Sequence, residues 1–276
     1  MRSLFTFLFA VCSVLLVQAQ NTATPVIKAT LPPELEEISG MIHLNGKLYG
    51  IEDSQNPAIL YEFDSTSGAI TKTITLDVAN SDWEDITHDG TYIYVADIGN
   101  NNGTKSVLRF YKFPIQAIED ITGETGTISS EQIETIKFTY SDYVSSRAFD
   151  CEAVFYYNGY LHLFTKNWIA PNTTVHYKLQ VPSTPTESTL TAERLEEFNT
   201  QDILVTGATM MNDRIVALLG YNDRNVHGLS TACAMWLIQG FTDIDQLFSA
   251  ESSKLKIDIG YASSVGQLES VTAVSQ

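Results

Sequence analysis

Short runs of apolar residues, separated by tight polar turns, recur along the whole chain. Each of four units opens with a short polar motif, continues into an apolar strand, turns, and enters a second apolar strand. The turns are Asn45-Gly46, Asp89-Gly90, Asn158-Gly159 and Asn212-Asp213. Asn-Gly and Asp-Gly pairs favour type I′ turns, because these turns need positive φ at both central residues. The pattern therefore predicts that each unit begins with an antiparallel hairpin.

Further strand-like runs complete the first three units, at residues 59–63, 69–76, 107–113, 133–140, 175–181 and 194–198. Four strands in each repeated unit are typical of a propeller blade. No segment has the period of a long amphipathic helix, and residues 116–130 are expected to form an exposed loop with at most one short helical turn. We therefore predict an all-β fold, a β-propeller of four-stranded blades.

The opening motifs set the expected number of blades. They align Glu37, Glu84, Glu152, Thr206 and Glu269, with spacings of 47, 68, 54 and 63 residues. A ring of blades usually closes by pairing an N-terminal strand with the last blade, and residues 25–31 fit such an outer strand. Because the fifth motif is followed by a single inner strand, we expect a last blade that is truncated in this chain. The full-length protein would have five blades, or six.

The N-terminus predicts export. Residues 1–19 have the features of a signal peptide, with Arg2, an apolar run over 4–17, and Val17 and Ala19 before Gln20. The run is shorter than the roughly 20 residues that a bilayer-spanning helix needs. We therefore expect a propeller domain over 20–276, a secreted, periplasmic or cell-surface location, and no transmembrane segment after signal removal. Export permits a disulfide between Cys151 and Cys233, but two buried thiols are the default expectation.

The charge balance narrows the class of partner. The 276 residues contain 16 Lys and Arg against 33 Asp and Glu, which gives a formal net charge of -17. A surface this acidic repels the phosphates of nucleic acids and membranes. It favours cations, neutral sugars or other small molecules, and proteins. We expect a monomer with no nucleic-acid partner.

Four carboxylates recur at the openings of the inner strands, which line the channel of a propeller: Glu37, Glu84, Glu152 and Glu269. Crowded carboxylates raise one another's pKa or bind a cation, and their hard oxygen atoms suit Ca²⁺ or Mg²⁺. The first interpretation is an axial metal site formed by these four residues. In the second, each carboxylate accepts hydrogen bonds from amides of the neighbouring inner strand and links one blade to the next.

Other polar residues follow the second strand of each hairpin, where loops often carry binding groups. The binding candidates are Asp53, Asn100, Asn167 and Trp168. If the site is catalytic, Lys166 would stabilise an anionic substrate and Asp97 would hold a metal or act as a base. The alternative is that these residues serve the turns, where Asp, Asn and Gly are favoured regardless of function. The five histidines lack metal-ligand spacing, and His162 is expected to be a core residue with satisfied hydrogen bonds.

Several motifs resemble secreted β-propeller proteins of the Bacteroidota. They are DWEDI (82–86), ADIGNN (96–101), FDCEA (149–153), FTKNW (164–168), VTGA (205–208) and LLGY (218–221). The resemblance covers roughly residues 31–274 and implies the propeller fold, with little information about a reaction. Proteins of this family often carry a C-terminal type IX secretion sorting domain, and we expect none within these 276 residues. The acidic opening motif is also remotely similar to phytase-like or esterase-like propellers.

Together these observations predict a secreted binding or scaffold module that a cation at the central channel stabilises. One alternative is a metal-dependent hydrolase of phosphate esters or lactones that acts at the channel mouth. Another is a cell-surface module that binds other proteins.

Overall fold

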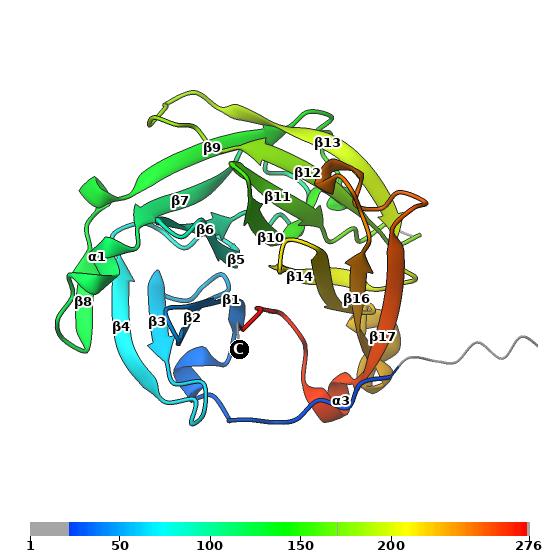
Figure 1. The fold of residues 1–276 in the computed structure, drawn as a ribbon, viewed down its shortest axis with the longest axis horizontal. Helices are drawn as coiled ribbons and strands as arrows, with labels where there is room; N and C mark the ends of the chain where they lie inside the picture. The colour runs from blue at the N-terminus through cyan, green and yellow to red at the C-terminus, as the bar shows by residue number, and fades with distance from the viewer. Residues whose placement is uncertain (1–21, 170, 275–276) are drawn as a thin grey trace, which may run out of the picture.

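The computed structural model describes residues 22–169 and 171–274, so the predicted signal peptide lies outside the described residues. Four antiparallel four-stranded blades surround a central axis, and the first strand of each blade lies innermost (Figure 1). Parallel pairing at the outer edges extends the first blade to a five-stranded sheet and joins the second and third blades into one eight-stranded sheet. This arrangement is a β-propeller, as the repeats predicted. None of the helices in the described ranges is long and apolar enough to cross a bilayer.

The strands follow each blade from the axis outward. Blade 1 contains β1 (Ile38–Leu44), β2 (Lys47–Glu52), β3 (Ile59–Phe63) and β4 (Ile70–Leu76). Blade 2 contains β5 (Trp83–His88), β6 (Tyr92–Asp97), β7 (Leu108–Pro114) and β9 (Glu134–Tyr140). Blade 3 contains β10 (Cys151–Tyr157), β11 (Tyr160–Thr165), β12 (Thr173–Gln180) and β13 (Leu190–Asn199). Blade 4 contains β14 (Leu204–Met211), β15 (Ile215–Tyr221), β16 (Ala232–Gln239) and β17 (Ser253–Tyr261).

Helices are short and lie in the connections. The α-helical turns are α1 (Gln116–Glu119), α2 (Arg224–His227) and α3 (Ala262–Val265). The 3-10 turns are Pro33–Leu35, Ser130–Gln132, Arg147–Phe149, Gly228–Ser230 and Ile244–Gln246. The predicted loop over 116–130 is wrong in part, because it also contains β8 (Thr125–Ile128), which pairs in parallel with β4 of blade 1.

The predicted hairpins are confirmed in all four blades. Asn45, Asn158, Asn212 and Asp213 have φ between 46° and 53°, and Gly46, Gly90 and Gly159 also have positive φ. Apolar side chains fill the space between successive blades. Trp83 and Phe113 lie between blades 1 and 2, Phe138 and Tyr177 lie between blades 2 and 3, and Trp236 lies between blades 3 and 4. Cys151 and Cys233 are buried free thiols, which confirms the expectation of two unpaired cysteines.

Each inner strand has a β-bulge at the same place in its motif. The register shifts between residues 38 and 40, 83 and 85, 151 and 153, and 205 and 207. Ser39, Glu84, Glu152 and Thr206 are therefore the equivalent residues. The sequence alignment was wrong for blade 1, because it placed Glu37 where the structure has Ser39.

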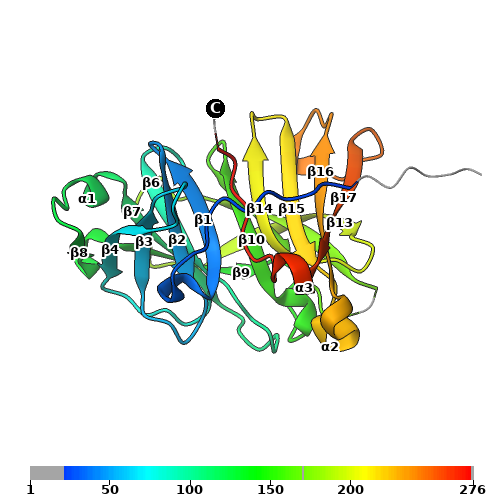
Figure 2. The same ribbon diagram turned by 90° about the horizontal axis from the view of Figure 1, so that it is seen from below.

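A fifth segment, residues 266–274, occupies the remaining inner position (Figures 1 and 2). Thr206 Oγ1 donates to the carbonyl of Leu268 at 2.5 Å, as Ser39 Oγ donates to the carbonyl of Trp83 at 2.9 Å. Thr272 Oγ1 accepts from the His43 amide at 3.1 Å, as Thr87 Oγ1 accepts from the Tyr156 amide at 3.0 Å. The same two contacts recur around the ring, so five inner segments close it.

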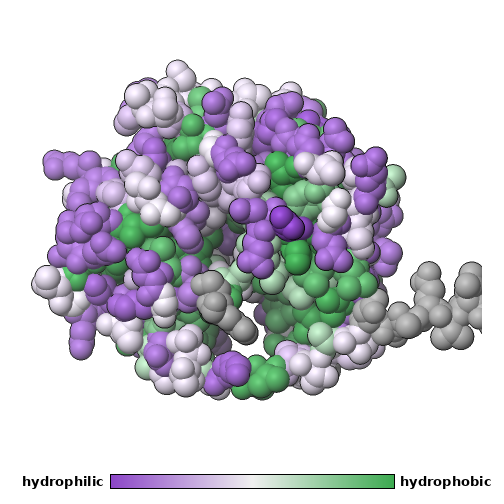
Figure 3. Space-filling model, in the orientation of Figure 1, coloured by the Kyte–Doolittle hydropathy of each residue, from purple (hydrophilic) through white to green (hydrophobic). Residues whose placement is uncertain are grey.

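The outer edge of blade 4 meets the N-terminal segment. Thr22 forms a parallel bridge to Asp258 of β17, and β13 likewise pairs in parallel with β9 of the preceding blade. Residues 23–32 contain no strand, so the predicted strand over 25–31 is wrong. The segment instead crosses the gap between blades 4 and 1, where apolar side chains border a hollow in the surface (Figure 3).

Asp85 links three inner strands at the centre of the channel. Its side chain is 1% exposed and accepts hydrogen bonds from Val154 N on β10 and Ile86 N, both at 2.8 Å. The Ala208 amide of β14 bonds to it as well. Gly40 lets β1 approach the same point, since a Cβ there would lie 2.7 Å from Asp85 Cα. A carboxylate therefore links neighbouring inner strands, but it is Asp85 and not one of the four predicted glutamates, whose donors among the described residues are side chains.

We expect Asp85→Ala to destabilise the propeller, because the amides of Val154 and Ala208 would lose a buried acceptor. Each unsatisfied amide costs about 1–3 kcal/mol. Asp85→Asn keeps one oxygen acceptor and should lose less. Urea unfolding followed by tryptophan fluorescence measures both changes, and an Ala variant as stable as the wild type would contradict the link.

Two histidines are buried together in blade 3, between β11 and β12. His162 Nδ1 lies 2.8 Å from His176 Nε2, and the other two ring nitrogens have no partner among the described residues. Phe155 stacks on His162 and Phe164 stacks on His176. Burial lowers the pKa of His162 to about 4 and lowers the pKa of His176 well below its usual range. His162 is a core residue as predicted, but its hydrogen bonds are not all satisfied.

This pair predicts acid sensitivity. Between the unfolded pKa of roughly 6.5 and the folded value near 4, the unfolded chain binds protons that the folded chain refuses. The free energy of unfolding should therefore decrease as the pH is lowered through this window, by about 1.4 kcal/mol per pH unit for each histidine. Urea unfolding at pH 7, 6 and 5 tests this. The double variant His162→Leu/His176→Phe should show a shallower fall, whereas the exposed-site control His227→Gln should match the wild type.

Candidate functional site

A cavity of about 710 Å³ lies at one end of the central channel, where the inner strands begin and the second strands end. It is bounded by the openings of β1, β5, β10 and β14, the ends of β2, β11 and β15, and the segment 266–270. All four carboxylates that the sequence singled out line it: Glu37, Glu84, Glu152 and Glu269. Asp53, Lys166 and Trp168 line it as well.

The residue at each inner-strand bulge determines which chemical group that blade presents at this cavity. In blades 1 and 4 the bulge residue is a hydroxyl, Ser39 or Thr206, which donates to the carbonyl before the next opening motif. In blades 2 and 3 it is a longer carboxylate, Glu84 or Glu152, which lies against the cavity. A bulge re-aims a side chain at a strand end, so a single repeated backbone feature presents two kinds of group.

Lys166, after β11, neutralises Glu152. Its Nζ lies 2.8 Å and 2.6 Å from the two Glu152 oxygens and 3.1 Å from Tyr221 Oη. Burial by itself lowers the pKa of Lys166, but the Glu152 carboxylate outweighs it and raises that pKa well above its usual range. Tyr221 in turn donates to Glu269 Oε1 at 3.1 Å. These groups form one connected network on the blade 3 and 4 side, in which Lys166 compensates the charge of Glu152 but not that of Glu269.

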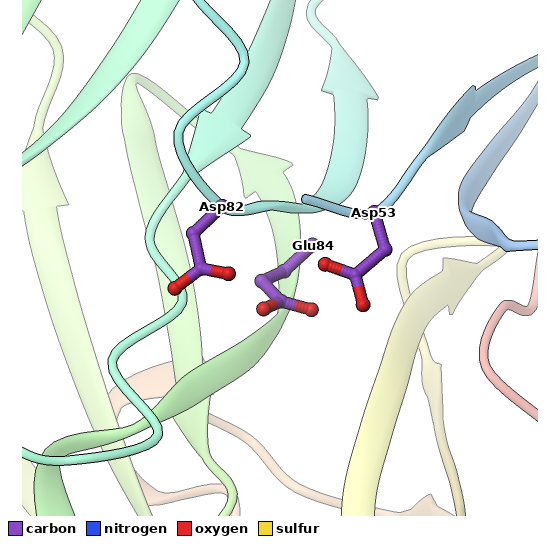
Figure 4. A group of neighbouring side chains, drawn as sticks. All are labelled: Asp53, Asp82 and Glu84. Carbon is purple, nitrogen blue, oxygen red and sulfur yellow. The ribbon is translucent and has the colours of Figure 1, made fainter. Parts of the chain in front are cut away.

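Glu84 is placed differently. It is 6% exposed, and no donor among the described residues bonds to its carboxylate. It points toward Asp53 and Asp82, and one oxygen of each residue lies within 4.8 Å of the others (Figure 4). Burial raises the pKa of Glu84 well above its usual range, and the neighbouring carboxylates raise it further. Burial also raises the pKa of Asp53.

Glu37 and Glu269 lie nearer the solvent. Glu37 is exposed and accepts from Asn56 Nδ2 at 2.7 Å, while Glu269 is partly exposed and bonds to Tyr221 and Gln267. The four predicted carboxylates therefore share one cavity without converging on one point. The group that does converge is Asp53, Asp82 and Glu84.

The predicted catalytic pair is not brought together. Asp97 is buried at the end of β6, where Arg109 Nε lies 3.8 Å and Tyr111 Oη 3.4 Å from its Oδ2. It does not line the cavity, and none of its contacts in the described residues is with Lys166.

The two asparagines that were binding candidates organise loops. Asn100 is 2% exposed, and its side chain exchanges hydrogen bonds with the backbone of Lys105. The backbone N–H of Asn100 donates to Asp150 Oδ1 at 2.6 Å. Asn167 bonds to Thr173 and to the amide of Ile169. The turn interpretation describes both residues.

Trp168 lines the cavity beside Lys166. Its Nε1 donates to Asp150 Oδ2 at 2.7 Å, and Lys166 Nζ lies 4.8 Å from its ring centroid.

The sequence singled out neither Asp82 nor Gln267 as a site residue. Asp82 stands two positions before Glu84 in the DWEDI motif, which was the available signal.

Comparisons with known proteins add no function. No protein-family model matches the sequence, and no curated protein matches it. Hydrazine synthase from Kuenenia stuttgartiensis is 12% identical with a TM-score of 0.42, over 85% of this chain and 70% of that one. The WD40 β-propeller domain of Doa1 is 8% identical with a TM-score of 0.38, over 80% and 68%. The computationally designed protein Ika4 is 10% identical with a TM-score of 0.35, over 71% and 93%.

The Lys166–Glu152 pair makes a testable contribution to stability. Both side chains are 6% exposed, so Lys166→Met leaves a buried carboxylate without its counter-charge. We expect a loss of about 3–5 kcal/mol in the free energy of unfolding. The double variant Glu152→Gln/Lys166→Met should recover most of it. Lys137→Met, in an exposed ion pair, is the matched control and should change nothing measurable. A single variant as stable as the double one would contradict the pairing.

Proposed function

We propose that the chain is an exported binding module whose channel-mouth cavity takes a small ligand that carries positive charge. The observation that supports this most is the charge of the cavity lining. One ammonium group, that of Lys166, lines the cavity. Six carboxylates line it as well: Glu36, Glu37, Asp53, Glu84, Glu152 and Glu269. Because Lys166 is held by Glu152, the remaining carboxylates have no basic partner within the lining.

The size and surface of the cavity fit a small organic cation. Its volume of about 710 Å³ falls within the range of small-molecule sites, roughly 300–1,000 Å³. The rings of Trp168 and Tyr221 also line the cavity, and aromatic faces attract ammonium and guanidinium groups. Lys166 Nζ already lies over both rings, at 4.8 Å and 5.2 Å from their centroids. A lysine or arginine side chain of a partner protein has the same chemistry, which keeps the cell-surface interaction module within this proposal.

The hydrolase alternative has less support. A phosphate ester or another anionic substrate would enter a cavity of its own charge sign. The ammonium that would stabilise it, Lys166, already donates to both oxygens of Glu152. Asp97, the expected metal ligand or base, pairs with Arg109 outside the cavity lining. These contacts favour binding of a cation over hydrolysis.

Export belongs to this proposal because of the sequence before residue 20. An apolar segment preceded by Arg2 is typical of a signal peptide. Two free, buried thiols are compatible with an oxidising compartment, since neither thiol is accessible to a partner.

Isothermal titration calorimetry with three probes tests the ligand class. Spermidine represents cations, phytate anions and glucose neutral sugars. We expect spermidine to bind, more weakly at 0.5 M than at 0.15 M NaCl, because salt screens charge attraction. Glu269→Gln and Trp168→Leu should each weaken it by about 3- to 30-fold, as expected for loss of a partly exposed charge or cation–π contact.

Glu187→Gln, a fully exposed carboxylate away from the cavity lining, is the control and should bind like the wild type. Melting temperatures of all variants establish that they are folded. Binding of phytate without binding of spermidine would contradict the proposal and favour the hydrolase.

A further inference from the structure

The carboxylate of Glu84 stands out among the equivalent positions of the ring. Ser39 and Thr206 bond to the next segment, and Glu152 bonds to Lys166. Glu84 is only 6% exposed, and it receives no hydrogen bond from the described residues. Burying an ionised carboxylate without a partner costs free energy, and either a bound proton or a bound cation would lower that cost.

The surroundings of Glu84 are shaped around carboxylate oxygens. Gly99 follows β6, and a Cβ on it would lie 2.1 Å from Glu84 Oε1 and 2.5 Å from Asp82 Cγ. A larger residue at position 99 would displace one or both acids, so glycine leaves room for their present arrangement. Asp53 approaches from the end of β2, so two chain segments, at residue 53 and at residues 82–84, bring carboxylate oxygen atoms to one place (Figure 4).

From these contacts we propose that Asp53, Asp82 and Glu84 bind one calcium ion at the acidic corner of the channel-mouth cavity. The inference rests on the proposed function, because it names a cationic ligand for part of the same cavity. It also moves the metal away from the predicted ring, since Glu37, Glu152 and Glu269 take part in other contacts.

The geometry suits calcium. Ca²⁺ binds oxygen atoms at roughly 2.3–2.6 Å, so ligands on opposite sides of one ion are up to about 5 Å apart. The three ligand oxygens lie within 4.8 Å of one another. One oxygen of each aspartate already accepts a hydrogen bond: Asp53 Oδ1 from the Ser54 amide and Asp82 Oδ2 from Lys105 Nζ. The second oxygen of each aspartate accepts no hydrogen bond from the described residues.

The local charge suits a divalent ion. The three carboxylates, when ionised, carry three negative charges, and Lys105 supplies one positive charge 2.7 Å from Asp82. A divalent cation would therefore make the group neutral. Calcium tolerates irregular sets of carboxylate ligands, whereas Mg²⁺ demands near-ideal octahedral geometry and keeps several waters.

The test compares the full chain with Glu84→Gln and Asp53→Asn, and with Glu187→Gln, a fully exposed carboxylate outside the cavity lining, as control. Calorimetric titration with CaCl₂ should show one site in the wild type and in Glu187→Gln. Either corner variant should lose at least about tenfold in calcium affinity, as loss of one charged ligand predicts. Calcium should also raise the melting temperature of the wild type and leave that of Glu84→Gln unchanged.

A second readout separates a ligand from a merely structural residue. Without calcium, Glu84→Gln should melt at a higher temperature than the wild type, because the substitution removes a buried, unpartnered carboxylate. With calcium in excess the order should reverse. A structural role for Glu84 predicts lower stability of the variant under both conditions, and that result would overturn the proposal.

The remaining outcomes are also decisive. Absence of calcium binding to the wild type, equal calcium affinity in Glu84→Gln, or a response to MgCl₂ alone would each overturn the calcium site. Spermidine binding in the same preparations keeps the two proposals apart. If spermidine binds and calcium does not, the corner site is wrong and the cationic cavity stands. If calcium binds and spermidine does not, the ligand class proposed for the wider cavity is wrong.

Discussion

The close packing of five inner segments around the axis is the constraint on which the rest of the structure depends. Backbones that approach this closely leave no space for large side chains, and every polar group there must find a partner. Gly40 and Gly207 supply the space, and Asp85 supplies acceptors for amides of β10 and β14. The outer strands are free to carry insertions because they do not share this constraint.

The same constraint produces the functional site. Each bulge directs one side chain out of the packed ring toward the channel mouth or the neighbouring segment. All four bulge residues line the cavity, but the short hydroxyls of Ser39 and Thr206 are bonded to the adjacent carbonyl, whereas Glu84 and Glu152 present carboxylates. The site thus arises from two longer side chains, Glu84 and Glu152, at positions whose backbone is common to all the blades.

Charge then divides the cavity into two halves. On the side of blades 3 and 4, Lys166 compensates Glu152 and connects through Tyr221 to Glu269. On the side of blades 1 and 2, Lys105 compensates only Asp82, and Glu84 has no partner in the described ranges. The unequal compensation connects the two proposals, since an organic cation and a calcium ion would each supply positive charge that the protein itself does not.

Local patterns in the sequence determined the blades. Asn-Gly turns and apolar alternation act over a few residues, so the hairpins and most strands follow from them directly. The cavity membership of Glu84, Glu152 and Glu269 also followed, because repetition in a propeller implies repetition around its axis, whereas Glu37 lines the cavity without being the repeated position. Only the tertiary structure decided which partner each charged group has. The bulge residue of blade 1 is Ser39 and not the predicted Glu37. Asp97 pairs with Arg109, and Asp53 lies beside Asp82 and Glu84. A bulge shifts register by one residue and a loop can bring any side chain to the channel mouth. Such contacts depend on positions in space that neighbouring residues along the chain do not encode.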